Sequence, residues 1–208
     1  MNLKYRQFHI LERELEALAP MHRVAFAAAC CERLYPHYDI YLRAAREDDW
    51  DGEDLFRVAL NEIWEFLAGK KVEVAIFRQL YSDSDQSYPD HENIETPEAQ
   101  RAADAILNTL ELCLDPSVQQ TISVAKEIHE TLFEYIDYLY QCEDEYSADI
   151  SHEELVKIVA NHPFTVREMA KQSEDLQRLR ETPTLTAEFL QWLRTSSENG
   201  GKSLLDLS

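Results

Sequence analysis

The sequence predicts an all-α protein built as a single-domain, largely up-and-down multi-helix bundle. The 208 residues include only 4 Gly and 7 Pro, while 29% are charged, which favours long helices over short strands joined by tight turns. Apolar residues recur at three- and four-residue spacings along most of the chain, as they do on amphipathic helices. Short connections between these segments favour antiparallel neighbours. We expect one helical domain over residues 1–198 and a frayed C-terminal tail over residues 199–208.

A central helix is predicted to begin at Pro20 and to end or kink at Pro36. Proline suits the first turn of a helix, where its missing N–H is not needed, but it disrupts a helix interior. Between the two prolines the side chains are mostly small and apolar, which lets neighbouring helices approach closely. These small residues are Ala25, Ala27, Ala28, Ala29, Cys30 and Cys31. We therefore expect a buried Ala/Cys-rich helix at the centre of the bundle.

The other helices follow from apolar periodicity and from capping residues. A short helix carrying Tyr38 and Tyr41 is expected after Pro36, and Asp51 is placed to cap the next helix, which has two apolar stripes and therefore two buried sides. The helix that starts near Pro116 is expected to be the longest. The remaining helices are predicted over residues 5–18, 72–81, 97–113, 152–160, 165–179 and 184–194.

Charge and cysteine usage limit the partners and the compartment. The formal net charge is −20, from 40 acidic and 20 basic residues, and it would repel phosphate backbones and anionic membrane surfaces. We therefore expect no direct nucleic-acid binding and no membrane association. No apolar signal segment or membrane-spanning run is present, which indicates a cytoplasmic protein. The cysteines lack metal-binding spacing and are expected to be buried, reduced thiols: Cys30, Cys31, Cys113 and Cys142.

Two segments of the sequence resemble a known family. One is the run Val24-x-Phe26-x-x-x-x-Cys31-Glu32-Arg33-x-Tyr35-Pro36-x-Tyr38, and the other is Arg57-x-x-Leu60-x-x-Ile63-Trp64-Glu65-x-Leu67. They resemble the YjaG-like family of small bacterial proteins, a domain of unknown function, and the resemblance spans most of the chain. It implies an all-helical, cytoplasmic bacterial protein. It brings no activity, substrate, cofactor or catalytic residue to this chain.

A polar cluster is predicted near the end of the central helix. Adjacent Glu32 and Arg33 point in different directions around a helix, so each needs its own partner, and Arg57 is the expected partner of Glu32. The cluster is interpreted either as an ion-pair clasp between two helices or as a polar pocket that binds a ligand. His22 is expected at the surface or a helix end, or facing a cleft. The candidate residues are His22, Glu32, Arg33, Tyr35, Tyr38, Arg57, Trp64 and Glu65.

No metal or cofactor site is predicted. None of the seven histidines belongs to a Glu-x-x-His or HExxH motif, and the acidic turn that begins at Glu47 has Val58 where a calcium loop needs a carboxylate. His129 lies within the apolar arc of its helix and is expected to be a core histidine with one hydrogen bond. An acidic stripe on the same helix is interpreted as a solvated face or as a docking surface for a basic partner; its carboxylates are Glu127, Glu130, Glu134 and Asp137.

The sequence contains no recognisable catalytic constellation, and no activity can be derived from it. It favours a non-enzymatic helical protein that acts through protein–protein interaction, as a monomer or homodimer with a partner yet to be identified. One alternative is a small-ligand binder or enzyme that uses the polar pocket near the end of the central helix. A second alternative is an acidic nucleic-acid mimic that binds a basic DNA-binding protein.

Overall fold

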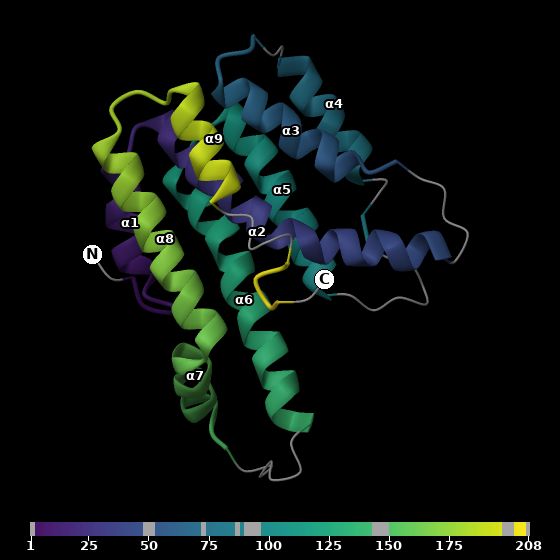
Figure 1. Cartoon of the computed structure of the whole chain (residues 1–208), viewed down its shortest axis with the longest axis vertical. Helices are drawn as coiled ribbons and strands as arrows, with labels where there is room; N and C mark the ends of the chain where they lie inside the picture. The colour runs from purple at the N-terminus through teal and green to yellow at the C-terminus, as the bar shows by residue number, and fades with distance from the viewer. Residues whose placement is uncertain are drawn as a thin grey trace.

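A computed structural model describes residues 3–47, 53–71, 74–85, 88–89, 97–142, 150–196 and 202–206. These residues form nine α-helices and no strand, so the predicted all-α class is confirmed (Figure 1). The helices are α1 (Phe8–Glu16), α2 (Pro20–Glu47), α3 (Leu55–Leu67), α4 (Val74–Asp85), α5 (Pro97–Leu114), α6 (Val118–Cys142), α7 (His152–Asn161), α8 (Pro163–Glu181) and α9 (Ala187–Thr195).

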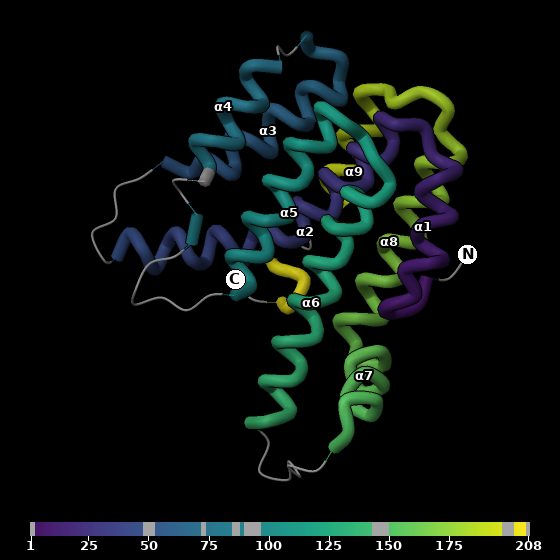
Figure 2. Tube along the Cα trace, turned by 180° about the vertical axis from the view of Figure 1, so that it is seen from behind, coloured from purple at the N-terminus to yellow at the C-terminus, as the bar shows by residue number. Residues whose placement is uncertain are grey.

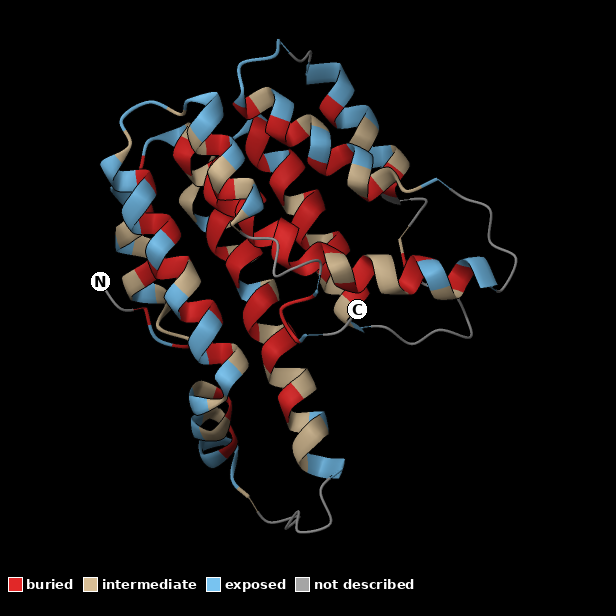
Figure 3. Cartoon of the chain, in the orientation of Figure 1, coloured by how far each residue is buried: buried red, intermediate tan, exposed pale blue. Residues whose placement is uncertain are grey.

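Helix α2 lies at the centre of the molecule, as its composition predicts. It contacts α3, α5, α6, α8 and α9. Every side chain from Val24 to Cys31 is fully buried, so the helix is enclosed on all sides at this level (Figure 3). Its small side chains allow this enclosure because they bring the backbones of several helices close together.

The break expected at Pro36 is wrong, because α2 continues through this residue to Glu47. Pro36 removes one helical hydrogen bond, to the carbonyl of Glu32, and a bend partway along α2 is visible in Figures 1 and 2. Beyond the bend, Tyr38 and Leu42 are fully buried, and this burial offsets the lost bond. With 28 residues, α2 is also longer than α6, which has 25, so the expectation that α6 is the longest helix is wrong.

Helices adjacent in sequence pack against one another from α2 through to α8, which agrees with a largely up-and-down bundle (Figure 2). Helix α3 is capped by Asp54, whose carboxylate accepts a hydrogen bond from the backbone N–H of Arg57 at 2.9 Å. The cap expected at Asp51 lies outside the described residues. Both apolar stripes of α3 are buried or half-buried, as predicted, because α2, α4 and α5 all pack against this helix.

The C-terminal segment does not fray where it is described. Ser203, Leu204 and Leu205 are buried, and both leucines belong to the hydrophobic core. Arg167 on α8 donates to the carbonyl oxygen of Leu204 at 2.6 Å and pairs with Asp206 at 2.9 Å. The expected frayed tail is therefore wrong for residues 203–205, because two adjacent leucines and an arginine on α8 anchor the segment.

Candidate functional site

Glu32 joins three helices through its buried carboxylate. Its Oε2 accepts from Nη1 of Arg57 on α3 at 2.8 Å, which confirms the predicted pair. Its Oε1 accepts from Nε1 of Trp64 at 2.9 Å and lies 2.9 Å from Nε of Arg194 on α9. Since Arg57 and Trp64 are seven residues apart, they lie on the same face of α3 and both reach the carboxylate. Glu32 therefore fixes the position of two arginines and a tryptophan.

A cavity of about 510 Å³ opens beside this carboxylate. Glu32, Tyr35, Pro36 and Asp39 contribute one face of α2, because they follow a three- and four-residue spacing. The other walls come from α3, the end of α9 and the C-terminal segment, through Arg57, Asn61, Arg194 and Lys202. Three cations and two carboxylates line this space, so the net charge of the lining is positive, although the formal net charge of the whole chain is −20.

Arg57 also stacks on Tyr35, with its guanidinium carbon 3.5 Å from the centre of the ring. The Tyr35 hydroxyl donates a short hydrogen bond to the carboxylate of Asp54. Burial, and then Asp54, raise the pKa of Tyr35, so this hydroxyl stays protonated. Burial opposes the charge on Arg57, but the Glu32 carboxylate outweighs it and raises the pKa of Arg57. Both side chains are thus held in one orientation and one protonation state.

Arg33 belongs to a different network, on the side of α2 that faces α8. Its Nε lies 2.9 Å from a carboxylate oxygen of Glu168, and its Nη1 lies 3.0 Å from Asp175. All three side chains are buried, and Lys171 also pairs with Asp175. Burial raises the pKa of Glu168, although Arg33 opposes this shift. Glu32 and Arg33 therefore have separate partners, as predicted, but Arg33 does not line the cavity.

Four other candidate residues also lie away from the cavity lining, including Trp64, which donates to Glu32 but does not line the cavity. Tyr38 is fully buried and packs edge-on against Phe56, with ring centres 4.7 Å apart. The Glu65 side chain is exposed. His22 is buried, and its Nε2 lies 2.7 Å from the carbonyl oxygen of Thr182, so the surface position expected for His22 is wrong. The cavity residues that the sequence did not suggest are Pro36, Asp39, Asn61, Arg194 and Lys202.

His129 is a core histidine, as predicted. Its Nδ1 accepts from the backbone N–H of Arg6 at 3.2 Å, and its ring stacks on Tyr5 with centres 4.9 Å apart. Burial, with the nearby Arg6, lowers the pKa of His129 to about 3. The ring is therefore neutral at physiological pH.

The acidic stripe of α6 is not simply a solvated face. Arg101 on α5 pairs with Glu127 and Glu134, and Arg6 pairs with Glu130 at 3.0 Å. These three carboxylates are therefore partly neutralised within the chain, which reduces the charge available to a basic partner.

The remaining metal, thiol and membrane predictions can be compared with the described residues. Within these residues, no group of three or more His, Cys, Asp or Glu side chains could hold a metal ion, and most of the acidic turn that begins at Glu47 lies outside them. Cys30, Cys31 and Cys113 are buried free thiols, whereas Cys142 is exposed, contrary to expectation. None of the described helices combines the length and the apolar character needed to cross a membrane.

The fold and the cavity define an all-helical protein with a polar pocket at the junction of α2, α3 and α9. Residues 10–208 match the family model described as a protein of unknown function, DUF416, and the chain belongs to this family. It is similar to the uncharacterized protein YjaG of Escherichia coli strain K12, with 25% identity over 189 residues that cover 91% of each chain. The predicted resemblance to the YjaG-like family is therefore confirmed.

Two further relatives agree with this assignment. The uncharacterized protein YjaG of Salmonella typhimurium is 24% identical over 194 residues, which cover 93% of this chain and 94% of the relative. A crystal structure of a DUF416 family protein from Shewanella baltica OS155 superposes with a TM-score of 0.78 at 23% identity, covering 95% of this chain and 97% of that one. This likeness supports the fold.

Proposed function

We propose that this protein binds a small organic anion, a carboxylate or a phosphate, in the cavity between α2, α3, α9 and the C-terminal segment. One observation carries the proposal: the buried Glu32 carboxylate holds Arg57 and Arg194 side by side at the wall of an open cavity. A guanidinium has five N–H groups, so each arginine keeps donors beyond those it gives to Glu32. Their side chains are 28% and 29% exposed, so these donors remain accessible to a ligand.

Preorganisation of the two arginines supports anion binding. Arginine side chains lose about 2 kcal/mol of rotamer freedom when they are ordered, and here the contacts with Glu32, Tyr35 and Asn61 have already ordered them. Lys202, which is exposed and makes no ion pair with any described residue, adds a third cation. Arginine forks match the planar oxygens of carboxylates and phosphates.

The simpler alternative is that the Glu32 cluster is only a clasp between helices. Lys202 separates the two interpretations because it lines the cavity but takes no part in the clasp. We propose binding rather than catalysis, since the described residues of the cavity lining include no serine, threonine, cysteine or histidine, and burial together with Asp54 keeps the Tyr35 hydroxyl protonated.

The first experiment is native mass spectrometry of protein purified gently, which would reveal a retained small molecule. NMR titrations with inorganic phosphate and citrate then compare the wild type with Lys202→Gln. The matched control is Lys71→Gln, at an exposed position without an ion pair in the described structure. We expect saturable shifts at the cavity residues and an affinity about three- to tenfold weaker in Lys202→Gln alone, or about 0.7–1.4 kcal/mol. Equal affinity in both variants, or the absence of saturable shifts, would refute anion binding and support the interpretation of the Glu32 cluster as a clasp between helices.

We also propose that the protein works in the cytoplasm. Its thiols at Cys30, Cys31 and Cys113 are unpaired and buried, which fits a reducing compartment. Cell fractionation of a tagged protein tests this location.

A further inference from the structure

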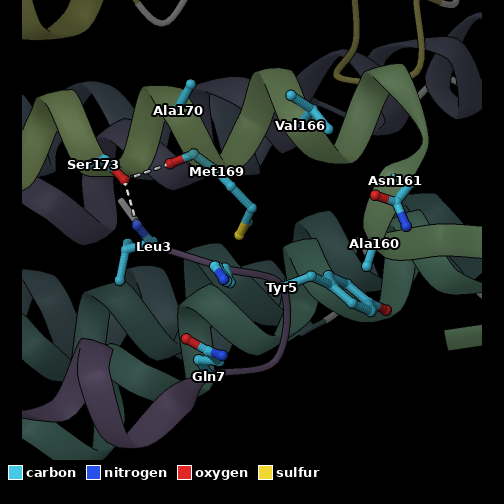
Figure 4. Close-up of a pocket in the computed structure, with 10 residues that line it drawn as sticks. Leu3, Tyr5, Gln7, Ala160, Asn161, Val166, Met169, Ala170 and Ser173 are labelled. Atoms are coloured by element: carbon cyan, nitrogen blue, oxygen red, sulfur yellow. Dashed lines mark hydrogen bonds between the residues drawn. The ribbon is translucent and has the colours of Figure 1, made fainter. Parts of the chain in front are cut away.

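A second cavity, of about 590 Å³, lies between the N-terminal segment, defined here as residues 3–7, and helices α7 and α8 (Figure 4). Its volume is typical of sites that hold small ligands, which range over about 300–1,000 Å³. It shares no lining residue with the cavity beside Glu32. A ligand here would therefore be independent of the anion proposed above.

The walls of this cavity are fixed by specific contacts. The backbone N–H of Leu3 donates to Oγ of Ser173 on α8 at 2.9 Å, a bond that is drawn in Figure 4. Arg6 has a φ of 58°, in the left-handed region, and this turn directs its N–H to His129 on α6. A non-glycine residue persists in this conformation only where the surroundings impose it. The N-terminal segment is thus held in a defined conformation and forms one wall of the cavity.

The cavity wall is largely apolar. Figure 4 shows the Met169 side chain extending from α8 toward the N-terminal segment, with Ala160 at one end of the cavity. Val166 also lines the space and is 55% exposed, so its side chain offers apolar surface that a ligand in the cavity would cover. Methionine adapts its shape to irregular apolar ligands.

The charged group of this cavity is Lys4, which is exposed and makes no ion pair with any described residue. The other polar side-chain groups of the lining are the amides of Gln7 and Asn161 and the hydroxyls of Tyr5 and Ser173. An apolar wall with one unpaired ammonium group complements a molecule with an apolar body and one negative charge.

We infer that this cavity binds a small amphipathic carboxylate, with its hydrocarbon chain along Met169 and Val166 and its carboxylate at Lys4. The hydrocarbon chain supplies affinity by covering the exposed apolar surface of Val166 and Ala170 beside the buried Met169, and the ion pair fixes the orientation of the ligand.

The test is a calorimetric titration with hexanoate, octanoate, decanoate and decanol. Affinity should increase about two- to fourfold per added methylene, as expected for burial of apolar surface. Decanol should bind about three- to fivefold more weakly than decanoate, and Lys4→Gln should remove this difference whereas Lys71→Gln should keep it. Equal binding of decanol and decanoate to the wild type would overturn the role of Lys4, and absence of saturable binding would overturn the site.

Location is tested by filling the cavity. Ala170 is exposed and lines it, so Ala170→Trp should abolish decanoate binding, whereas Ala75→Trp on the exposed face of α4 should not change it. If Ala170→Trp does not fold, Val166→Asp replaces it, because a carboxylate at this exposed position opposes the ligand's charge and should weaken binding more than about tenfold. Decanoate affinity unchanged in the folded variant would place the ligand elsewhere and refute the inference.

Discussion

Replacing Glu32 with glutamine tests how strongly one carboxylate holds α2, α3 and α9 together. The Glu32→Gln variant keeps the size of the side chain but removes the charge that two arginines share. It also places an NH₂ group where a donor such as Arg57 or Trp64 now meets an acceptor. The fold should survive, because the surrounding apolar core is unchanged.

The size of the effect follows from the burial of the partners. Removing one member of a fully buried ion pair costs about 3–5 kcal/mol. The Glu32 side chain is 4% exposed, but those of Arg57 and Arg194 are 28% and 29% exposed, so water compensates part of the loss. We expect the free energy of unfolding to fall by about 2–3 kcal/mol, which lowers the melting temperature by about 5–10 °C in a chain of this size.

Urea unfolding followed by circular dichroism measures this loss. The control is Glu65→Gln, which removes an exposed carboxylate from α3 and should change stability by less than about 0.5 kcal/mol. A double-mutant cycle with Arg194→Gln should show coupling of about 1 kcal/mol, because the two side chains interact directly. If Glu32→Gln is as stable as the Glu65→Gln control, the carboxylate does not join the helices and the reasoning is refuted.

Three further predictions concern other parts of the molecule. Burial lowers the pKa of His37 to about 4, and burial together with Arg6 lowers that of His129 to about 3. The unfolded chain therefore binds more protons below about pH 6.5, and stability falls by up to about 1.4 kcal/mol per histidine per pH unit. Urea unfolding at about pH 7 and about pH 5.5 should show this loss, and His37→Gln should show a smaller one; an identical pH dependence would contradict the prediction. Leu205→Ala should cost about 2–4 kcal/mol in the same assay, because Leu205 is 2% exposed, whereas a frayed tail would give almost no change. Ellman's reagent should titrate Cys142 rapidly and the other three thiols only after unfolding, since burial raises the pKa of Cys31 and of Cys113 to about 12; rapid reaction of a second thiol would disagree.

The local sequence pattern was sufficient to predict the helices and part of the candidate site. The small residues before Cys31 predict the buried centre of α2, because few side chains there need water. The roughly 100° between successive helical residues predicts that Glu32 and Arg33 have different partners, and Arg57 is indeed the partner of Glu32, whereas Arg33 pairs with Glu168.

Tertiary packing decided what the sequence did not show. Arg194 and Lys202 complete the cavity although they are far along the chain from Glu32, and neither has a local signal apart from its charge. Glu168 and Asp175 became the partners of Arg33 only because α8 packs on that side of α2. Pairings of this kind depend on which helix faces meet, and helical periodicity does not specify the meeting partner.

The same distinction explains two of the structural errors, those at Pro36 and in the C-terminal segment. Judged from local sequence alone, Pro36 predicts the end of a helix, and the short segment after Gly200 and Gly201 predicts a frayed chain end. In the fold, the buried Tyr38 and Leu42 keep α2 continuous, and the buried Leu204 anchors the end of the chain. The sequence by itself determined which segments are helical and which of their faces are apolar. Only the tertiary structure decided where burial of apolar side chains stabilises a segment that its local sequence predicts to end or fray. The reason is that the apolar area removed from water depends on all the neighbouring elements together.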